Sequence, residues 1–181
     1  MTIPKQSIRR NELVVAAAKL FKENSFDRTT VRMLAAATGI KSGSLFHHFK
    51  GKEEILVAVI EDGLKKSLKA VQTETQSLTD INQTLFALIY GHLKTLHVSI
   101  TEWRSLSDES KQHLITLRDE YEQFWQKIII EAIDNRLLTG EPTLIRLFIL
   151  GSLNWSIEWF QPTQGKSIKE LAQQFYNMVA K

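Results

Sequence analysis

Six polar and basic side chains lie within one short segment, residues 29–55, and their types suit contact with a nucleic acid. Ammonium and guanidinium groups neutralise phosphate oxygens, and serine and histidine side chains hydrogen-bond base edges in the major groove of DNA. The chemistry that these groups can do together is noncovalent recognition of double-stranded DNA. They are Arg32, Lys41, Ser44, His47, Lys50 and Lys52.

Two short helices joined by a glycine turn are expected to position these side chains. Thr30 can cap the first helix, because threonine accepts hydrogen bonds from free amides at helix starts. Leu34 and Ala35 continue the 3.6-residue spacing of one buried stripe. Gly39 supplies the left-handed conformation that ends this helix and lets the chain reverse.

The second short helix is expected to present its outer face to DNA. Ser42 can cap it, and Leu45 and Phe49, four residues apart, point inward. A small, polar and basic outer face suits insertion into the major groove, so the pattern predicts a helix-turn-helix. The outward residues are Gly43, His47 and Lys50, with Ser44 and Phe46 on the flanks.

This segment resembles the N-terminal domain of the TetR family of bacterial transcriptional regulators. The residues in register with the family's motif are Thr29, Thr30, Leu34, Ala35, Gly39, Ile40, Ser42, Gly43, Ser44, Leu45, Phe46, His48, Phe49, Lys52, Glu53 and Leu56. The family usually has tyrosine where this chain has Phe46, so one phosphate contact is expected to be missing. The resemblance also implies phosphate contacts for Arg32 and Lys52. The expected DNA-binding residues are Thr30, Arg32, Lys41, Ser42, Gly43, Ser44, Phe46, His47, His48, Lys50 and Lys52.

Charge divides the chain into two parts. The chain has 23 basic and 20 acidic side chains. Residues 1–52 hold ten basic and three acidic ones, and residues 53–181 hold 13 basic and 17 acidic ones. This polarity predicts a helix-turn-helix DNA-binding domain over 1–52 and a helical ligand-binding and dimerisation domain over 53–181. Taken alone, the charge also fits a solvated basic face with no partner.

Composition argues against several other functions. The chain has no cysteine, which excludes disulfides, thiol nucleophiles and zinc–thiolate sites. No metal-ligand spacing, glycine-rich phosphate loop or nucleophile elbow occurs, so we expect no catalytic residue, metal or cofactor. An all-helical carboxylate enzyme is a distant alternative. Neither a signal peptide nor a run of about 20 apolar residues is present, which predicts a cytoplasmic protein with no membrane partner.

The fold class is expected to be all-α with about nine helices, because no alternating strand pattern occurs. The first helix is expected to begin after Ser7 and end near Asn24, with Phe26 filling the junction of the first three helices. The fourth is expected to run from Lys52 to about Thr73, its N-terminal amides facing DNA phosphates. The other five are a helix opened by Thr79 or Asp80, a short helix over 102–106, a long helix capped by Ser107, an apolar helix from Pro142 to about Phe160 stopped by Pro162, and a last helix with a Ser167–Glu170 capping box.

The apolar helix over 142–160 is the basis for predicting a homodimer. A helix that is apolar on all sides must be buried on more than one side, and a symmetric partner can cover its outer side in a four-helix bundle. The alternative is that the same residues close a monomer core. The expected interface residues are Phe148, Ser152, Trp159, Ile168, Leu171 and Phe175.

The body also resembles, over shorter strings, a TetR subgroup that represses fatty-acid or steroid catabolism and responds to acyl-coenzyme A thioesters. The matching residues are Trp103, Leu106, Ser107, Arg118, Tyr121, Gly151, Asn154, Trp155, Trp159, Pro162 and Glu170. The resemblance implies a small-molecule effector of that class. The candidate ligand-binding residues are His92, Trp103, Arg118, Tyr121, Trp125, Asn154, Trp155 and Glu158.

Each ligand candidate has a simpler structural interpretation. His92 on an inner stripe is more commonly a satisfied core residue, and the tryptophans are at least as consistent with ordinary core. Arg118 can pair with a ligand carboxylate or phosphate, or equally with Glu122 one turn on. Asn154 and Glu158 need partners, because bare polar groups are costly in an apolar helix.

The function predicted from the sequence is a DNA-binding transcriptional regulator, and specifically a repressor that a ligand releases from its operator. Two heads are expected to read a palindromic site, and the ligand to shift the fourth helix and so the spacing of the heads. A ligand-independent activator or architectural protein is the alternative.

Overall fold

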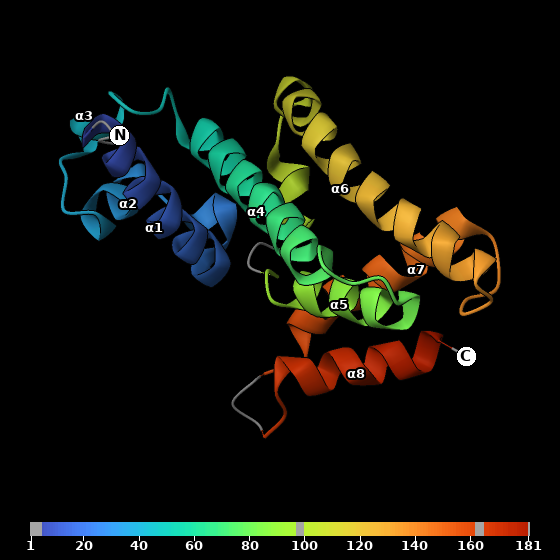
Figure 1. The fold of residues 1–181 in the computed structure, drawn as a ribbon. Helices are drawn as coiled ribbons and strands as arrows, with labels where there is room; N and C mark the ends of the chain where they lie inside the picture. The colour runs from blue at the N-terminus through green and yellow to red at the C-terminus, as the bar shows by residue number, and fades with distance from the viewer. Residues whose placement is uncertain (1–4, 97–99, 162–164, 181) are drawn as a thin grey trace. The chain divides into compact units, whose positions relative to one another are not determined.

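Every regular element in the described residues is a helix, which confirms the expected all-α fold (Figure 1). The computed structural model describes residues 5–96, 100–161 and 165–180, so Pro162, the expected helix stop, lies outside the described residues. None of the described helices is long and apolar enough to cross a bilayer. The elements are α1 (Lys5–Arg28), α2 (Val31–Ala37), α3 (Ser42–Leu45), α4 (Lys52–Thr75), α5 (Ile81–Leu93), η1 (Ile100–Ser105), α6 (Asp108–Asp134), α7 (Pro142–Trp155), η2 (Ser156–Glu158) and α8 (Ile168–Val179), where η marks a 3-10 helix.

The chain forms two compact units that do not coincide with a division at residue 52. The first unit is 1–63 with 97–116, and the second is 64–96 with 117–181. The start of α4 therefore belongs to the same unit as the first three helices, together with η1 and the first turns of α6. As a result, α4 and α6 each contribute residues to both units.

Helix α1 has a kink at Ser25 and ends at Arg28, so it does not stop near Asn24 as expected. Ser25 has a φ of 63°, in the left-handed region, whereas the Asn24 amide donates to a carbonyl of the preceding turn (3.2 Å). The kink exposes backbone carbonyl groups. The buried Thr29 hydroxyl donates to the Ser25 carbonyl (2.8 Å). Phe26 then packs on Phe21 with ring centroids 5.4 Å apart, as expected for a residue at the helix junction.

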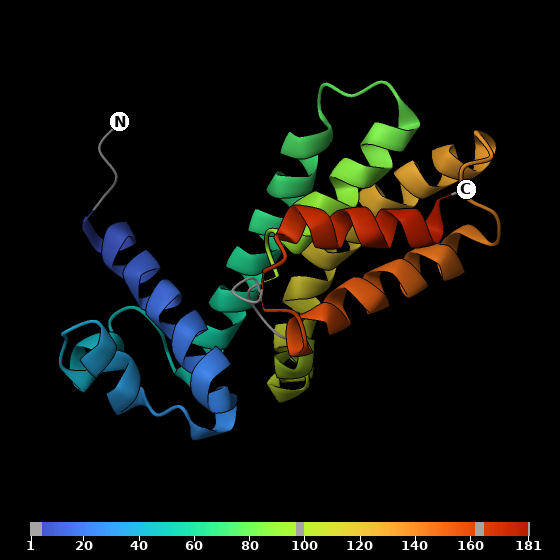
Figure 2. The same ribbon diagram turned by 90° about the horizontal axis from the view of Figure 1, so that it is seen from below.

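The core of the second unit is one continuous apolar cluster from α4 to α8. Helix α8 lies along α5 in both views (Figure 1 and Figure 2). Helix α5 approaches α4 so closely at Gly91 that a Cβ there would lie 3.1 Å from Val71 Cα and 3.3 Å from the Ala70 carbonyl. The fully buried members of the core include Leu85, Leu88, Ile89, Trp125, Ile129 and Leu153.

Helix α7 is shorter and less buried than expected. Pro142 is its first residue, as predicted, and Glu141 caps it by accepting from the amides of Thr143 (2.9 Å) and Leu144 (2.7 Å). The α-helix ends at Trp155 and continues as η2, so the expected single helix to Phe160 is wrong. Within one chain, the core covers a single face of α7, that of Ile149, Leu150 and Leu153.

Candidate DNA interface and effector site

The turn between α2 and α3 has the geometry that the sequence predicts. Thr30 is the N-cap of α2, and its hydroxyl accepts from the Met33 amide (3.2 Å). Gly39 has a φ of 66°, and the Ile40 amide donates back to the Ala35 carbonyl (3.0 Å). These bonds fix the direction in which the chain enters α3.

Helix α3 is a single short turn with an inner and an outer face. Lys41 takes the N-cap position without a side-chain bond, so the expectation that Ser42 caps this helix is wrong. Leu45 and Phe49 are buried, as predicted. Of the expected DNA-binding residues, Ser42, Ser44, His48 and Lys52 are half-buried, and the exposed ones are Thr30, Arg32, Lys41, Gly43, Phe46, His47 and Lys50.

Lys52 is held inside the first unit and is not a free phosphate ligand. Its ammonium donates to the carbonyls of Phe26 (2.9 Å) and Asp27 (3.4 Å), and it lies 4.2 Å from the centre of the Phe26 ring. An ammonium has three hydrogens, and two of these bond to carbonyls at the end of α1. Lys52 therefore ties α4 to α1, a role that the sequence motif did not indicate.

The start of α4 carries its own negative charge. Glu54 accepts from the Lys50 amide (2.6 Å), and Glu53 and Glu54 both lie in the first turn, where they compensate the positive end of the helix. This arrangement weakens the expectation that the α4 amides hold phosphate. Sequence reasoning also missed Arg10, whose guanidinium lies 4.6 Å from the Phe49 ring on the inner side of α3.

A cluster of buried polar rings occupies the core of the second unit. His92 of α5 and Tyr121 of α6 share a hydrogen bond between Nδ1 and the phenol oxygen. The Trp125 ring stands edge-on to His92, with centroids 5.7 Å apart and planes at 90°. The structure thus brings together three of the eight candidate ligand residues, and a fourth, Asn154 of α7, lies next to His92.

Burial sets the protonation of this cluster. It lowers the pKa of His92 to about 4, against a weaker opposing effect of the Asn154 side chain, so the ring is neutral at pH 7. Burial also raises the pKa of Tyr121, opposed by the Trp125 N–H. Tyr121 therefore keeps its proton. In the tautomer in which its hydroxyl donates to His92 Nδ1, the ring hydrogen of His92 lies on Nε2.

Two ring nitrogens of the cluster make no hydrogen bond of normal geometry with any of the described residues. They are His92 Nε2 and Trp125 Nε1, both fully buried. Asn154 and Tyr121 lie close enough to influence the pKa values, yet neither closes a bond of normal geometry to these atoms. An unsatisfied buried donor costs about 1–3 kcal/mol, so an added acceptor at either nitrogen would be stabilising.

The remaining ligand candidates lie outside this cluster. Arg118 pairs with Glu122 (3.5 Å) and Asp119 (3.4 Å), the local pairing that the sequence left open. Glu158 is exposed in η2, so the expectation that it sits in a costly apolar setting is wrong. Trp155 is 67% exposed and does not line the core. Trp103 is half-buried in η1 and belongs to the first unit.

Arg146 is a buried cation that sequence reasoning missed. Only 11% of its side chain is exposed, and it donates to Glu122 (2.5 Å) and Gln126 (2.8 Å) of α6. A single arginine in the apolar run of α7 was the available signal, because a charge there needs a partner.

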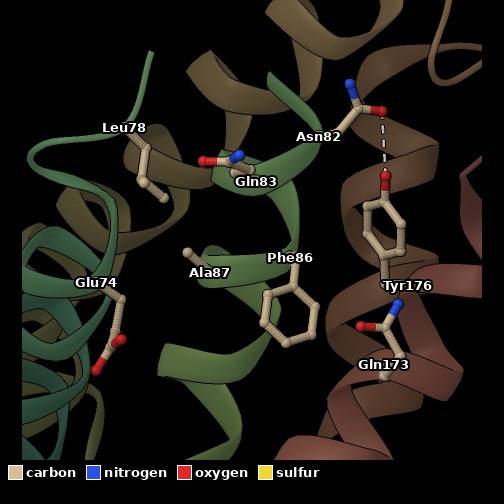
Figure 3. Close-up of a pocket in the computed structure, with 8 residues that line it drawn as sticks. All are labelled: Glu74, Leu78, Asn82, Gln83, Phe86, Ala87, Gln173 and Tyr176. Atoms are coloured by element: carbon tan, nitrogen blue, oxygen red, sulfur yellow. Dashed lines mark hydrogen bonds between the residues drawn. The ribbon is translucent and has the colours of Figure 1, made fainter. Parts of the chain in front are cut away.

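An open groove of about 470 Å³ lies between α5, α8 and the last turn of α4 (Figure 3). The Tyr176 hydroxyl donates to the Asn82 side chain across it (3.1 Å), and the Phe86 ring stands edge-on to Tyr176. None of the candidate ligand residues lines this groove. Its lining combines polar and apolar residues of two segments, 74–87 and 173–176, which no sequence pattern links.

One face of α7 is apolar and exposed. Phe148 is 74% exposed, and Leu144, Leu147, Trp155 and Trp159 are also exposed. Of the expected interface residues, Phe148, Ser152 and Trp159 are thus on the surface, whereas Leu171 is buried in its own core with Ile168 and Phe175 packed against that core. The residues predicted on α8 therefore lie on its inner face, and the exposed apolar residue of this helix is Met178.

Comparison with known proteins identifies the family that this architecture defines. Residues 13–59 match the profile of bacterial regulatory proteins of the tetR family, and residues 71–181 match the tetracyclin repressor-like C-terminal domain. The chain belongs to the TetR family of bacterial transcriptional regulators. It is a DNA-binding regulator. The matched families and relatives are transcriptional regulators and not enzymes.

Individual relatives agree along nearly the whole chain. The transcriptional repressor KstR2 of Mycolicibacterium smegmatis is 28% identical over 181 residues, covering 94% of this chain and 88% of its own. A crystal structure described as the superantigen PfiT is 37% identical, with 99% of both chains covered and a TM-score of 0.81. AibR, solved in complex with isovaleryl coenzyme A and operator DNA, is 21% identical with a TM-score of 0.83 over 94% of this chain and 97% of its own, and so shares the fold.

Proposed function

We propose that the chain represses transcription by holding an operator through the outer face of α3. The observation that carries this proposal is the exposure of Gly43 in α3 and of Phe46 and His47 directly after it, on a segment that follows the Gly39 turn. His47 can bond base edges, and the Phe46 ring can contact a thymine methyl. Arg32, Lys41 and Lys50 are exposed cations that can contact phosphates.

Selection from a randomised pool of duplexes tests DNA recognition. The purified protein is expected to enrich a palindromic sequence, with a salt dependence set by its phosphate contacts. Lys50→Ala is expected to reduce the slope of log affinity against log salt by about 0.9, because one phosphate contact is lost. A pool without enriched sequence after repeated rounds contradicts the proposal.

Lys52→Ala is the matched comparison for Lys50→Ala. Since the Lys52 ammonium serves two α1 carbonyls, we expect the substitution to lower the melting temperature and to leave the salt slope nearly unchanged. Loss of a charge-assisted bond costs about 1.5–3 kcal/mol. Equal salt slopes for the two variants would show that Lys52 binds phosphate after all.

The exposed face of α7 supports a homodimer. Soluble monomers rarely expose contiguous apolar stripes of this kind, and a symmetric pair of α7 helices covers both copies at once. Sedimentation equilibrium is expected to give a mass near twice 20.8 kDa. A mass of one chain at micromolar concentration contradicts the dimer and the paired-head reading of a palindrome.

The unsatisfied donors of the buried cluster support a carbonyl-bearing effector. His92 Nε2 and Trp125 Nε1 can together hold one carbonyl oxygen, and an acyl thioester presents such an oxygen beside an apolar chain. AibR, with the same fold, was solved with isovaleryl coenzyme A, and this chemistry makes acyl-coenzyme A thioesters the effector class that we propose. Binding in the core of the second unit releases the operator by moving α4.

Native mass spectrometry followed by titration tests the effector class. A co-purified acyl-coenzyme A, or calorimetric binding of one member of a panel of thioesters, supports the proposal. Trp125→Phe is expected to weaken that binding about tenfold, because one donor to the carbonyl is lost. If no thioester of the panel binds, the ligand class is wrong, while the DNA-binding function stands.

A further inference from the structure

The start of α6 is capped by a side chain from another helix. The Glu53 carboxylate of α4 accepts from the Ser107 amide (2.8 Å) and from the Ser110 hydroxyl (2.7 Å). The Ser107 hydroxyl in turn accepts from the Ser110 amide (3.3 Å), which is the usual half of a capping box. All three residues belong to the first unit.

Helix α8 shows the same box completed within one helix. Its Ser167 hydroxyl accepts from the Glu170 amide (3.2 Å), and Glu170 accepts from the Ser167 amide (2.6 Å). In α6 the third helical position holds Ser110 in place of a glutamate, so the cap amide has no local acceptor. Glu53, 54 residues earlier, takes that role.

The position of Glu53 gives this cap a consequence for DNA reading. Its neighbour Lys52 holds the end of α1, so the first turn of α4 is bound to α1 on one side and to α6 on the other. Only residues 46–51 separate this turn from α3. A second link between the two helices follows along α4, where Glu61 faces His113 at 3.7 Å. A displacement of the start of α6 therefore moves the first turn of α4, and residues 46–51 connect that turn directly to α3.

We propose that Glu53 is a positioning residue that couples operator binding to the start of α6. The inference rests on the proposed DNA-binding role of α3. If Glu53 is the link, DNA bound at α3 must stabilise the first turn of α6, since coupling between two sites acts in both directions. Helix α6 also carries Tyr121 and Trp125 of the buried cluster, so this link would join the effector site to the operator.

Hydrogen–deuterium exchange of the full chain tests the coupling, with a duplex obtained by selection as the probe. In the wild type, the duplex is expected to slow exchange of the amides in peptide 107–114 by about fivefold or more. Glu53→Met keeps the side-chain length but removes both acceptor oxygens, and it is expected to abolish this slowing while the duplex still binds. Glu170→Met removes the equivalent cap of α8 and is expected to leave the slowing intact.

The outcomes separate this inference from the proposed function. Transmitted protection that persists in Glu53→Met, or that is absent from the wild type with DNA bound, overturns the coupling role. A protein that binds no selected duplex overturns the proposed function, and the inference with it. If Glu53→Met fails to fold, Ser110→Ala is the second variant, because it removes one of the two hydrogen bonds to Glu53. It is expected to lose part of the protection that DNA gives to the amides of 107–114.

Discussion

The buried cluster around His92 and the outer face of α7 depart from the ordinary partition of polar and apolar groups in opposite directions. The first places two ring nitrogens in the core without a hydrogen bond of normal geometry among the described residues, and the second places large apolar side chains in solvent. Both lie in the second unit, and both leave groups that one chain does not satisfy.

The difference between them lies in what can complete each one. The two ring nitrogens need only individual polar atoms as partners, so a small molecule is large enough to supply them. An apolar stripe along a whole helix needs a partner surface of similar length. We therefore propose a ligand at the buried cluster and a second subunit at the α7 face.

The largest expected effect comes from a charge on the apolar face. Phe148→Glu is expected to raise the dissociation constant of the dimer about 1,000-fold, or ~4 kcal/mol, because the symmetric interface buries the unpaired carboxylate twice. Sedimentation equilibrium measures the constant. Val15→Glu is the control, since Val15 of α1 is also an exposed apolar residue, at 61%. If both variants remain dimeric, the interface lies elsewhere.

The next effect concerns protons in the buried cluster. The pKa of His92 is about 4 in the folded chain and 6.5 ordinarily, so between these values the unfolded chain binds a proton that the folded chain does not. The free energy of unfolding therefore falls as pH drops from 6.5 to 4, by about 3 kcal/mol from this residue. Urea denaturation at fixed protein concentration should show a smaller fall for His92→Gln. Parallel pH profiles for the two proteins would refute the assignment.

A pair of tyrosines provides the finest comparison. Tyr121→Phe leaves His92 Nδ1 without a donor in the core, and we expect a loss of about 1–3 kcal/mol in the free energy of unfolding. Tyr176→Phe removes an equally specific bond to Asn82, but at the open groove, where water replaces it. Its expected cost is below about 0.5 kcal/mol. Similar losses in chemical denaturation would mean that the cluster admits water.

Features that depend on neighbouring residues were predictable from the sequence. The Thr30 cap, the left-handed Gly39, Pro142 at the start of α7 and the Ser167–Glu170 box each involve groups within a few positions of one another. Local hydrogen bonds and backbone sterics determine such features, so the residue types suffice to indicate them.

Features that depend on distant segments were not predictable. Ser107 was recognised as a cap, but its acceptor Glu53 is brought to it only by the fold. Lys52 matched a phosphate-binding position, whereas its partners are carbonyls just after the Ser25 kink, which the sequence did not indicate. In a helix as apolar as α7, periodicity also does not show which side the core takes, so Trp155 was assigned to a pocket although it is exposed.

The close crossing of α4 and α5 has a consequence for His92. The residue before it, Gly91, touches the α4 backbone, and a methyl group there would already be too near Val71. Any side chain at position 91 must push α5 outward and carry the imidazole with it. Because Gly91 has no side chain, α5 can pack directly against the α4 backbone, and this close packing sets how deeply the His92 ring reaches into the core.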